Sequence, residues 1–262
     1  MKAKLGQHFL VDESILEFEA EACEPKGKSV LEIGPGDGRF TQRLLKNGAG
    51  HITAVELDPK FVRELRMRFH TRVTVIQGDF LEFVPDKKYN IVAGNIPYYI
   101  TSPILFKLAE MDFDKAILCL QKEVGERMLA LPGSPDYGRL SVSTQLVFNM
   151  EFLAIVERHA FSPQPKVDSC ILSLEKTGFS LDAKTEIIIG AIFSHKKKSL
   201  RNAVIDARAQ LFGSKDKGKA GKISDKLKYS ERKVFTLSPL IYEHAIFFKV
   251  SNPKMKKPFP AS

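Results

Sequence analysis

The chain has 262 residues, 44% of them apolar, and a formal net charge of +9. This size can bury a core in one large domain or two smaller ones. No run of about 18 apolar residues occurs, which excludes a membrane-spanning helix, and the N-terminus MKAKLGQHFL is too short and too mixed for a signal peptide. Cys23, Cys119 and Cys170 show no metal or redox spacing. We therefore predict no metal site and a reducing, cytoplasmic location.

Strand patterns alternate with helix patterns through the first two thirds of the chain. The predicted strands are SVLEIG (29–34), HITAVE (51–56), VTVIQ (73–77), YNIVAG (89–94), KAILCLQ (115–121), RLSVSTQLVFN (139–149) and DSCILSLE (168–175), the last two close enough for a hairpin. Helices are predicted at 59–69, 102–110 and 122–131. This alternation favours an α/β fold with a mostly parallel sheet covered on both faces. In such sheets ligands bind at the carboxyl ends of the strands.

After residue 176 the pattern becomes helical and basic. Helices are predicted at 185–195, 199–212 and 238–250, with a basic loop at 213–228 and a disordered tail at 252–262. Residues 177–262 hold 18 Lys or Arg against 7 Asp or Glu, whereas residues 1–176 hold 22 against 24. We therefore predict a domain boundary between 176 and 177. On charge alone, a nucleic-acid partner and a solubilising lysine-rich surface are equal alternatives.

The loop EIGPGDG follows the first predicted strand and places Gly34, Gly36 and Gly38 where backbone must approach a ligand closely. Glu56 ends the second strand, where an acid can accept hydrogen bonds from two ribose hydroxyls. A dinucleotide loop has the spacing G-x-G-x-x-G, but here Arg39 stands at the third glycine position. The spacing instead resembles the first motif of class I methyltransferases, which bind S-adenosylmethionine (SAM). A nucleotide-dependent oxidoreductase is the disfavoured alternative.

Two further strand ends carry polar residues. Asp79, in QGDF, could accept a bond from an adenine amino group or cap the next helix. Asn95 opens NIPYYITSP, where its side-chain oxygen and the Ile96 carbonyl could accept the two N–H bonds of a planar exocyclic amine. Tyr98 offers a face for stacking, worth about 1–3 kcal/mol per base. The alternative is a proline turn whose tyrosines fill the edge of a core.

Several motifs in the same order resemble the ribosomal RNA adenine dimethyltransferases, the KsgA and Erm group. The resemblance runs from Gly6 to about Asn202 and rests on GQHFL (6–10), EIGPGDG (32–38), VELD (55–58), GDF (78–80), NIPYYITSP (95–103), YGRLSV (137–142), FSPQPKVDS (161–169) and KKSLRN (197–202). Tyr99 departs from the family, which often has Asn there. The fold implied is a Rossmann-like class I SAM-dependent methyltransferase domain at 1–176, with a small helical RNA-binding domain at 177–262.

The resemblance also implies roles for individual residues. The positions that match the family's SAM site are Gln7, His8, Leu10, Gly34, Gly36, Glu56, Asp79 and Asn95. Asn95 and Tyr98 match its catalytic amide and stacking ring, and Phe161 matches the ring on the other face of the target base. For Lys166 a structural role and a phosphate contact remain open.

YGRLSV, FSPQPKVDS and KKSLRN are more similar to the branch that acts on the small ribosomal subunit, and the absence of a transit peptide before GQHFL disfavours an organellar relative. The expected function is SAM-dependent dimethylation of two adjacent adenosines near the 3′ end of small-subunit rRNA, with a role in subunit assembly. The expected partner is that subunit or its precursor, and the expected state a monomer. The alternatives are an Erm-like methyltransferase of large-subunit rRNA and a non-catalytic assembly or transcription factor on the same fold.

Overall fold

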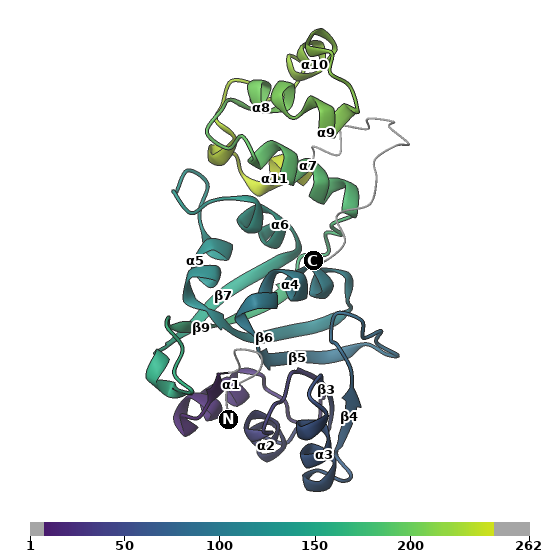
Figure 1. The fold of residues 1–262 in the computed structure, drawn as a ribbon, viewed down its shortest axis with the longest axis vertical. Helices are drawn as coiled ribbons and strands as arrows, with labels where there is room; N and C mark the ends of the chain where they lie inside the picture. Colours follow the sequence, from purple (N-terminus) through teal and green to yellow (C-terminus); the bar gives the residue numbers. More distant parts are fainter. Residues whose placement is uncertain (1–7, 244–262) are drawn as a thin grey trace. The chain divides into compact units, whose positions relative to one another are not determined.

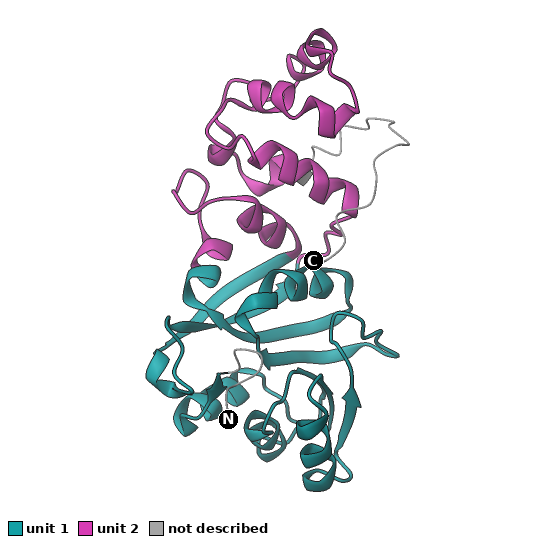
Figure 2. Ribbon diagram, viewed as in Figure 1, with its two compact units in different colours: residues 1–125, 148–176 teal, residues 126–147, 177–262 magenta. Residues whose placement is uncertain are grey.

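The computed structural model describes residues 8–243 (Figure 1). The chain divides into two compact units (Figure 2). The first contains residues 1–125 and 148–176, and the second contains residues 126–147 and 177–262. The boundary expected after residue 176 coincides with one junction between the units. Residues 126–147, however, group with the C-terminal helices.

The first unit is built on a seven-stranded sheet with the order β4-β3-β2-β5-β6-β9-β7. Its strands are β2 (Ser29–Ile33), β3 (His51–Glu56), β4 (Val73–Gln77), β5 (Tyr89–Asn95), β6 (Phe113–Gln121), β7 (Phe148–Val156) and β9 (Ser169–Lys176). The first five of these pair in parallel, and β9 runs antiparallel between β6 and β7. The predicted α/β class with a mostly parallel sheet is confirmed.

Helices cover both faces of this sheet. The helices of the first unit are α1 (Glu13–Ala22), α2 (Arg39–Lys46), α3 (Pro59–Arg68) and α4 (Thr101–Glu110), followed by α5 (Lys122–Leu129), which runs across the junction at residue 125. One core cluster joins alternate strand residues such as Val30, Ile52 and Ile91 to α1, α2 and α3. Figure 1 shows α4 on the opposite face. Because both faces of the sheet are buried, the sequences of its strands are nearly continuous apolar runs.

Local signals at the helix starts explain how the chain enters each helix. The Asp12 carboxylate accepts the backbone N–H groups of Ser14 and Ile15 at the start of α1. Asp58 caps α3, and Pro59 occupies its first turn, where no N–H donor is needed. Gly38 precedes α2 with a φ of 78°, and a Cβ there would lie 2.7 Å from the Leu65 side chain. The parallel pairing of β2 with β3 sets Ile33 opposite Val55, so α2 and α3 both begin shortly after the same carboxyl edge of the sheet.

The predicted strand at 139–149 is wrong. Residues Arg139–Val147 form helix α6, and the strand is β7, which pairs with β9 as the second arm of the expected hairpin. Apolar residues at every second position suggested a strand, but the small polar residues between them are buried and bonded in a helix. Thr144 donates to the Leu140 carbonyl at 2.8 Å, and Ser143 donates to Glu186 at 2.6 Å. Tertiary contacts therefore override the period-two pattern.

The second unit is helical, as predicted. It contains α6, α7 (Ala183–Phe193), α8 (Leu200–Asp206), α9 (Arg208–Phe212), α10 (Lys217–Ser224) and α11 (Pro239–Glu243). The helix expected at 199–212 is interrupted at Ala207, and the last helix begins at Pro239 as expected. Its predicted continuation and the predicted tail lie outside the described residues. Buried Tyr137 donates a hydrogen bond to the Leu237 carbonyl at 2.8 Å, which ties residues 126–147 to the end of this unit.

A two-stranded sheet completes the first unit. Strand β1 (Phe9–Leu10) pairs antiparallel with β8 (Phe161–Ser162), so that Leu10 lies opposite Phe161. This pairing brings Phe9 and Leu10, the end of the GQHFL motif, to the start of the FSPQPKVDS segment, which is about 150 residues away in the sequence. Within residues 8–243, no helix has the length and apolar character that crossing a bilayer requires.

Candidate active site

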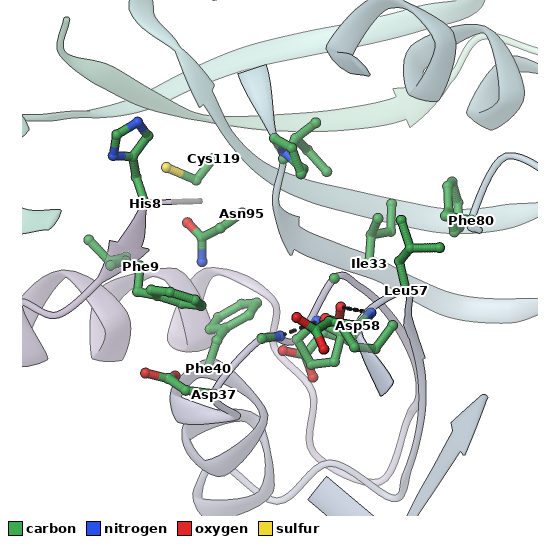
Figure 3. Close-up of a pocket in the computed structure, with 18 of the residues that line it drawn as sticks. His8, Phe9, Ile33, Asp37, Phe40, Leu57, Asp58, Phe80, Asn95 and Cys119 are labelled. Carbon is green, nitrogen blue, oxygen red and sulfur yellow. Dashed lines mark hydrogen bonds between the residues drawn. The ribbon is translucent and has the colours of Figure 1, made fainter. Parts of the chain in front are cut away.

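A pocket lies at the carboxyl ends of β2, β3, β4, β5 and β6, within the first unit (Figure 3). Its lining comes from the loops that follow these strands and from β1 and β8. His8, Asn95 and Cys119 lie at one end, and Leu57 and Phe80 lie at the other (Figure 3). The position agrees with the rule for open α/β sheets, in which ligands bind where the strands end.

Gly34 and Gly36 of the glycine loop form, with Glu56, a preorganised binding surface in this pocket. Both Gly34 and Gly36 have positive φ angles, 60° and 55°, which glycine adopts without strain. The Glu56 carboxylate is buried and accepts the backbone N–H of Gly36 at 3.0 Å and that of Asp58 at 2.8 Å. Each carboxylate oxygen keeps a second lone pair. Glu56 is therefore rigidly placed and still able to accept two hydroxyl groups.

This binding surface suits the ribose of a nucleoside cofactor. A Cβ at Gly36 would lie 2.8 Å from the Phe9 ring, so glycine is the residue that lets this ring lie so close to the loop. Asp79 lines the same pocket, and its Oδ1 accepts the Leu81 N–H at 2.8 Å. No helix follows Asp79 before β5, so the helix-capping alternative is wrong, and this oxygen holds a turn instead. No hydrogen bond from the described residues reaches the other oxygen, which can accept from a ligand amino group. Glu56, Asp79 and the apolar side chains of Leu57 and Phe80 together suit an adenosine moiety.

Asn95 ends β5 at the opposite end of the pocket. Its Nδ2 lies 3.5 Å from Glu19 Oε2, and its Oδ1 is buried without a hydrogen-bond partner among the described residues. The Ile96 N–H donates to the Cys119 carbonyl at 2.8 Å, but no hydrogen bond from the described residues reaches the Ile96 carbonyl. A buried acceptor without a donor is costly, by about 1–3 kcal/mol. These two oxygens therefore favour a ligand that brings N–H donors.

Two aromatic rings line the same pocket as this pair of acceptors. Tyr98 begins a short 3₁₀ turn after Pro97, and its hydroxyl lies 2.7 Å from Ser169 Oγ, which holds the ring in place. Burial raises the pKa of Tyr98, so the hydroxyl stays protonated. Phe161, on β8, lines the same pocket and is 6% exposed. Tyr98 and Phe161, which come from distant segments of the chain, thus line the same pocket as Asn95.

His8 lies beside Tyr98, with 5.8 Å between the ring centroids. Its Nδ1 is 2.7 Å from the Pro163 carbonyl oxygen. A carbonyl can only accept a hydrogen bond, so Nδ1 carries the proton. Since Pro163 follows β8 directly, this bond extends the β1–β8 pairing and keeps His8, Phe9 and Leu10 against the pocket.

The sequence matches the model of one protein family over residues 1–235, and that family is described as ribosomal RNA adenine dimethylase. The chain belongs to this family. A curated relative from Methanopyrus kandleri, named probable ribosomal RNA small subunit methyltransferase A, is 45% identical over 78% of this chain and 76% of its own length. A relative of the same name from Thermococcus onnurineus is 37% identical over 95% of this chain and 92% of its own length.

Two solved structures of related enzymes match most of the chain. A dimethyladenosine transferase from Plasmodium falciparum has a TM-score of 0.79 and 27% identity, covering 92% of this chain and 96% of that one. The 23S rRNA methyltransferase ErmE has a TM-score of 0.64 and 26% identity, covering 90% and 96%. The resemblance inferred from the motifs is confirmed, and the fold is that of a class I SAM-dependent methyltransferase.

The structure brings nearly all of the predicted site residues together. The pocket is lined by His8, Leu10, Gly34, Gly36, Glu56, Asp79, Asn95, Tyr98 and Phe161. Gln7 lies outside the described residues. Lys166 is exposed and does not line this pocket. The shared pocket supports the roles expected from the family, which remain predictions for these residues.

The motif analysis missed Glu19 and Ser169. Ser169 closes the FSPQPKVDS segment, and its contact with Tyr98 depends on how β5 and β9 are placed in the sheet. Glu19 lies on α1 and is completely buried. Its spacing from Leu16, Ala20 and Cys23 on the apolar face of a helix was a readable signal, because an acid at such a position is rarely buried without a reason.

Glu19 belongs to a buried acidic pair. Burial raises the pKa of Glu19 to about 8, and the nearby Glu32 carboxylate adds to this shift. Burial also raises the pKa of Glu32 to about 8, although Thr41 donates a hydrogen bond to it at 2.7 Å. Both carboxyls are therefore mostly neutral at pH 7. A neutral Glu19 places no full charge next to the Asn95 amide.

Proposed function

We propose that this chain dimethylates the exocyclic N6 amine of two adjacent adenosines near the 3′ end of small-subunit rRNA, with SAM as the methyl donor. The observation that carries the proposal is the unpartnered Oδ1 of Asn95, buried at the end of a pocket whose other end suits a nucleoside. The names of the archaeal relatives support the small subunit as the substrate.

The residues that would hold SAM are His8, Leu10, Gly34, Gly36, Glu56 and Asp79. Bound SAM supplies an electrophilic methyl group. Glu56 would accept the ribose hydroxyls on a carboxylate already held by two backbone N–H groups. Because these acceptors are fixed before the cofactor arrives, little ordering cost remains at binding.

Asn95 and Ile96 would align the target amine. Asn95 Oδ1 accepts one N–H of the amine, and the Ile96 carbonyl accepts the other. These bonds draw the nitrogen lone pair out of conjugation with the ring, and they stabilise the positive charge that develops as the nitrogen gains a methyl group. The proton leaves after the transfer, so alignment of the amine is the main catalytic contribution. Tyr98 and Phe161 would hold the base between their rings, away from its RNA stack.

The proposal is tested with labelled SAM and undermethylated small ribosomal subunits, with large subunits as the control. Digestion of the RNA and mass spectrometry should detect dimethyladenosine from small subunits only. Asn95→Ala should retain SAM binding and lose the product. Product from large subunits would instead assign the chain to Erm-like chemistry. If neither subunit is methylated while SAM still binds, the enzymatic proposal fails in favour of an assembly or transcription factor.

The cellular setting is part of the same proposal. We expect a cytoplasmic monomer that binds the small subunit or its precursor, with the second unit supplying phosphate contacts. Light scattering of the purified protein checks the monomer, and a dimer mass would contradict it.

A further inference from the structure

A second, polar pocket in the first unit is lined by residues that flank Phe161 and precede Ser169 in the sequence, two residues that line the active site. Its volume is about 470 Å³, and six of its seven lining residues are exposed. One wall is formed by Glu157, Arg158 and His159, and the other by Gln164 and Lys166 to Asp168. Phe161 lies in the chain between these walls, and Ser169, the partner of Tyr98, follows the second wall. A group bound here would therefore adjoin the proposed target base.

The pocket holds two acidic side chains, Glu157 and Asp168, and two basic ones, Arg158 and Lys166. Asp168 Oδ1 accepts the Arg158 backbone N–H at 3.0 Å, and the Glu157 carboxylate lies 3.2 Å from the His159 ring. Both carboxylates thus have local partners. Within the described residues, the Arg158 guanidinium and the Lys166 ammonium have no carboxylate within ion-pair distance. Two exposed cations at the rim of one pocket are well suited to a phosphate.

The rest of the lining suits a nucleobase. The His159 ring and the Val167 side chain, 43% exposed, offer surfaces for stacking. The Gln164 amide can both donate and accept hydrogen bonds at a base edge. This combination of a phosphate site, a ring and an amide matches one nucleotide of single-stranded RNA.

We propose that this pocket binds the nucleotide adjacent to the target adenosine in the same RNA strand, with its phosphate held by Arg158 and Lys166. The inference rests on the proposed function and makes it more specific. When one adenosine is held at Asn95, its neighbour is held in register, so the enzyme can exchange the two and modify both. It assigns Lys166 to a phosphate contact rather than to a structural role.

The test compares the double variant Arg158→Ala/Lys166→Ala with the control Lys26→Ala/Arg63→Ala. All four side chains are exposed and lie in the first unit. With undermethylated small subunits, we expect the first pair to lower kcat/KM about tenfold or more, the loss expected for two charge-assisted contacts. For the same variant, the slope of log kcat/KM against log salt concentration should become less negative by about 1.4. Each phosphate contact to a single strand contributes roughly 0.7 to that slope. SAM affinity should stay unchanged in both variants.

A second arm measures anisotropy of a labelled six-nucleotide oligoadenylate, so that the pocket is tested apart from catalysis. The pocket is supported if Arg158→Ala/Lys166→Ala lowers either kcat/KM or the affinity for the oligonucleotide and the control variant does not. Equal behaviour of the two variants in both arms overturns it, even if the wild type dimethylates small subunits. If the wild type makes no dimethyladenosine but binds the oligonucleotide through Arg158 and Lys166, the pocket stands and the proposed function fails. Absence of both activities in the wild type overturns the pocket as well.

Discussion

Asn95 is oriented by a side chain that belongs to none of the motifs. The carboxyl of Glu19 faces the amide nitrogen at 3.5 Å, a long contact, and Asn95 Oδ1 is left facing away from it. A carboxyl carbonyl oxygen accepts N–H and repels another acceptor oxygen. Glu19 therefore favours the amide orientation in which Oδ1 points to the target amine, and it acts as a positioning residue.

We expect Glu19→Leu to lower kcat about tenfold, because the amide of Asn95 then loses the partner that fixes its orientation. SAM affinity should stay within about twofold, since Glu19 contacts none of the groups that bind the ribose. Glu19→Gln, whose side-chain oxygen can still accept the Asn95 N–H, should recover most of the rate. Steady-state kinetics and calorimetry of the three proteins measure this. A purely structural role would instead lower the melting temperature of Glu19→Leu and leave kcat unchanged.

The raised pKa of Glu19 also predicts a pH dependence of stability. An unfolded glutamate titrates near 4.5, and the buried Glu19 titrates at about 8. The folded state therefore holds the proton over this interval, and stability is lost as the pH rises from about 4.5 to about 8. Glu19→Gln has no such proton, so its free energy of unfolding should fall less between pH 5.5 and 8.5. Urea denaturation at both values tests this, and parallel declines would refute it.

At the scale of elements, the active site depends on how closely β2 and β5 approach. Gly94 precedes Asn95 in β5, and a Cβ there would lie 2.6 Å from the Ile33 carbonyl oxygen in β2. That neighbour is backbone, which cannot rotate away. The glycine thus permits the spacing that sets Asn95 beside the glycine loop. The sequence pattern predicts Gly94 only as the last residue of an apolar strand and gives no sign of this role.

Gly94→Ala should therefore lower the free energy of unfolding by about 1–3 kcal/mol, the usual cost of overpacking. Because β5 must shift, kcat should fall as well. Gly221→Ala is the matched control, since a Cβ there meets no atom within 4 Å and alanine suits the interior of α10. Urea unfolding and methylation kinetics should separate the two variants. Equal stability of both would show that the sheet absorbs the methyl group.

The strand expected at 139–149 shows why element type can be misread. Alternating apolar residues predict a strand when one face is solvated. In α6, residues on all sides are buried, and the polar ones are bonded to the helix itself, to α7 or to the carbonyl groups of residues 127–130. With nearly every position buried, the pattern no longer distinguishes a period of 2 from a period of 3.6.

At the scale of the whole molecule, the two units do not correspond to two continuous stretches of chain. Residues 126–147 belong to the second unit, where the Gly133 N–H donates to the Phe235 carbonyl at 2.7 Å and Arg139 pairs with Glu186 at 2.5 Å. Tyr137 is fully buried there. A cut after residue 176 would remove all of these partners.

We expect a fragment of residues 1–176 to aggregate, because it exposes Tyr137 and the buried face of α6. A second fragment, in which a flexible Gly/Ser linker replaces residues 126–147, should fold and bind SAM. Circular dichroism, gel filtration and calorimetry compare the two. If residues 1–176 alone are as stable and monomeric as the linker version, the inserted segment does not depend on the second unit.

The basic surface of the second unit predicts a salt-dependent interaction with RNA. Residues 215–233 hold 8 basic and 3 acidic side chains, and the lysines on α10 are exposed. Lys217→Glu/Lys222→Glu should weaken subunit binding and flatten its salt dependence by roughly 0.7–0.9 per lost phosphate contact. Lys26→Glu/Arg63→Glu, with the same charge change in the first unit, is the control. An equal effect of both pairs would indicate general electrostatics rather than a binding surface.

The sequence alone determined the fold class, the family and most of the candidate site. These depend on residues next to one another in the chain, such as the glycine loop, the acid ending β3 and the Asn-Ile-Pro-Tyr turn, and local backbone geometry requires particular residue types there. Only the tertiary structure decided that Glu19 faces Asn95, that Ser169 holds Tyr98, that a polar pocket adjoins Phe161 and that residues 126–147 join the second unit. Such contacts join segments far apart in the chain, and their partners are selected by packing, which leaves no regular spacing in the sequence.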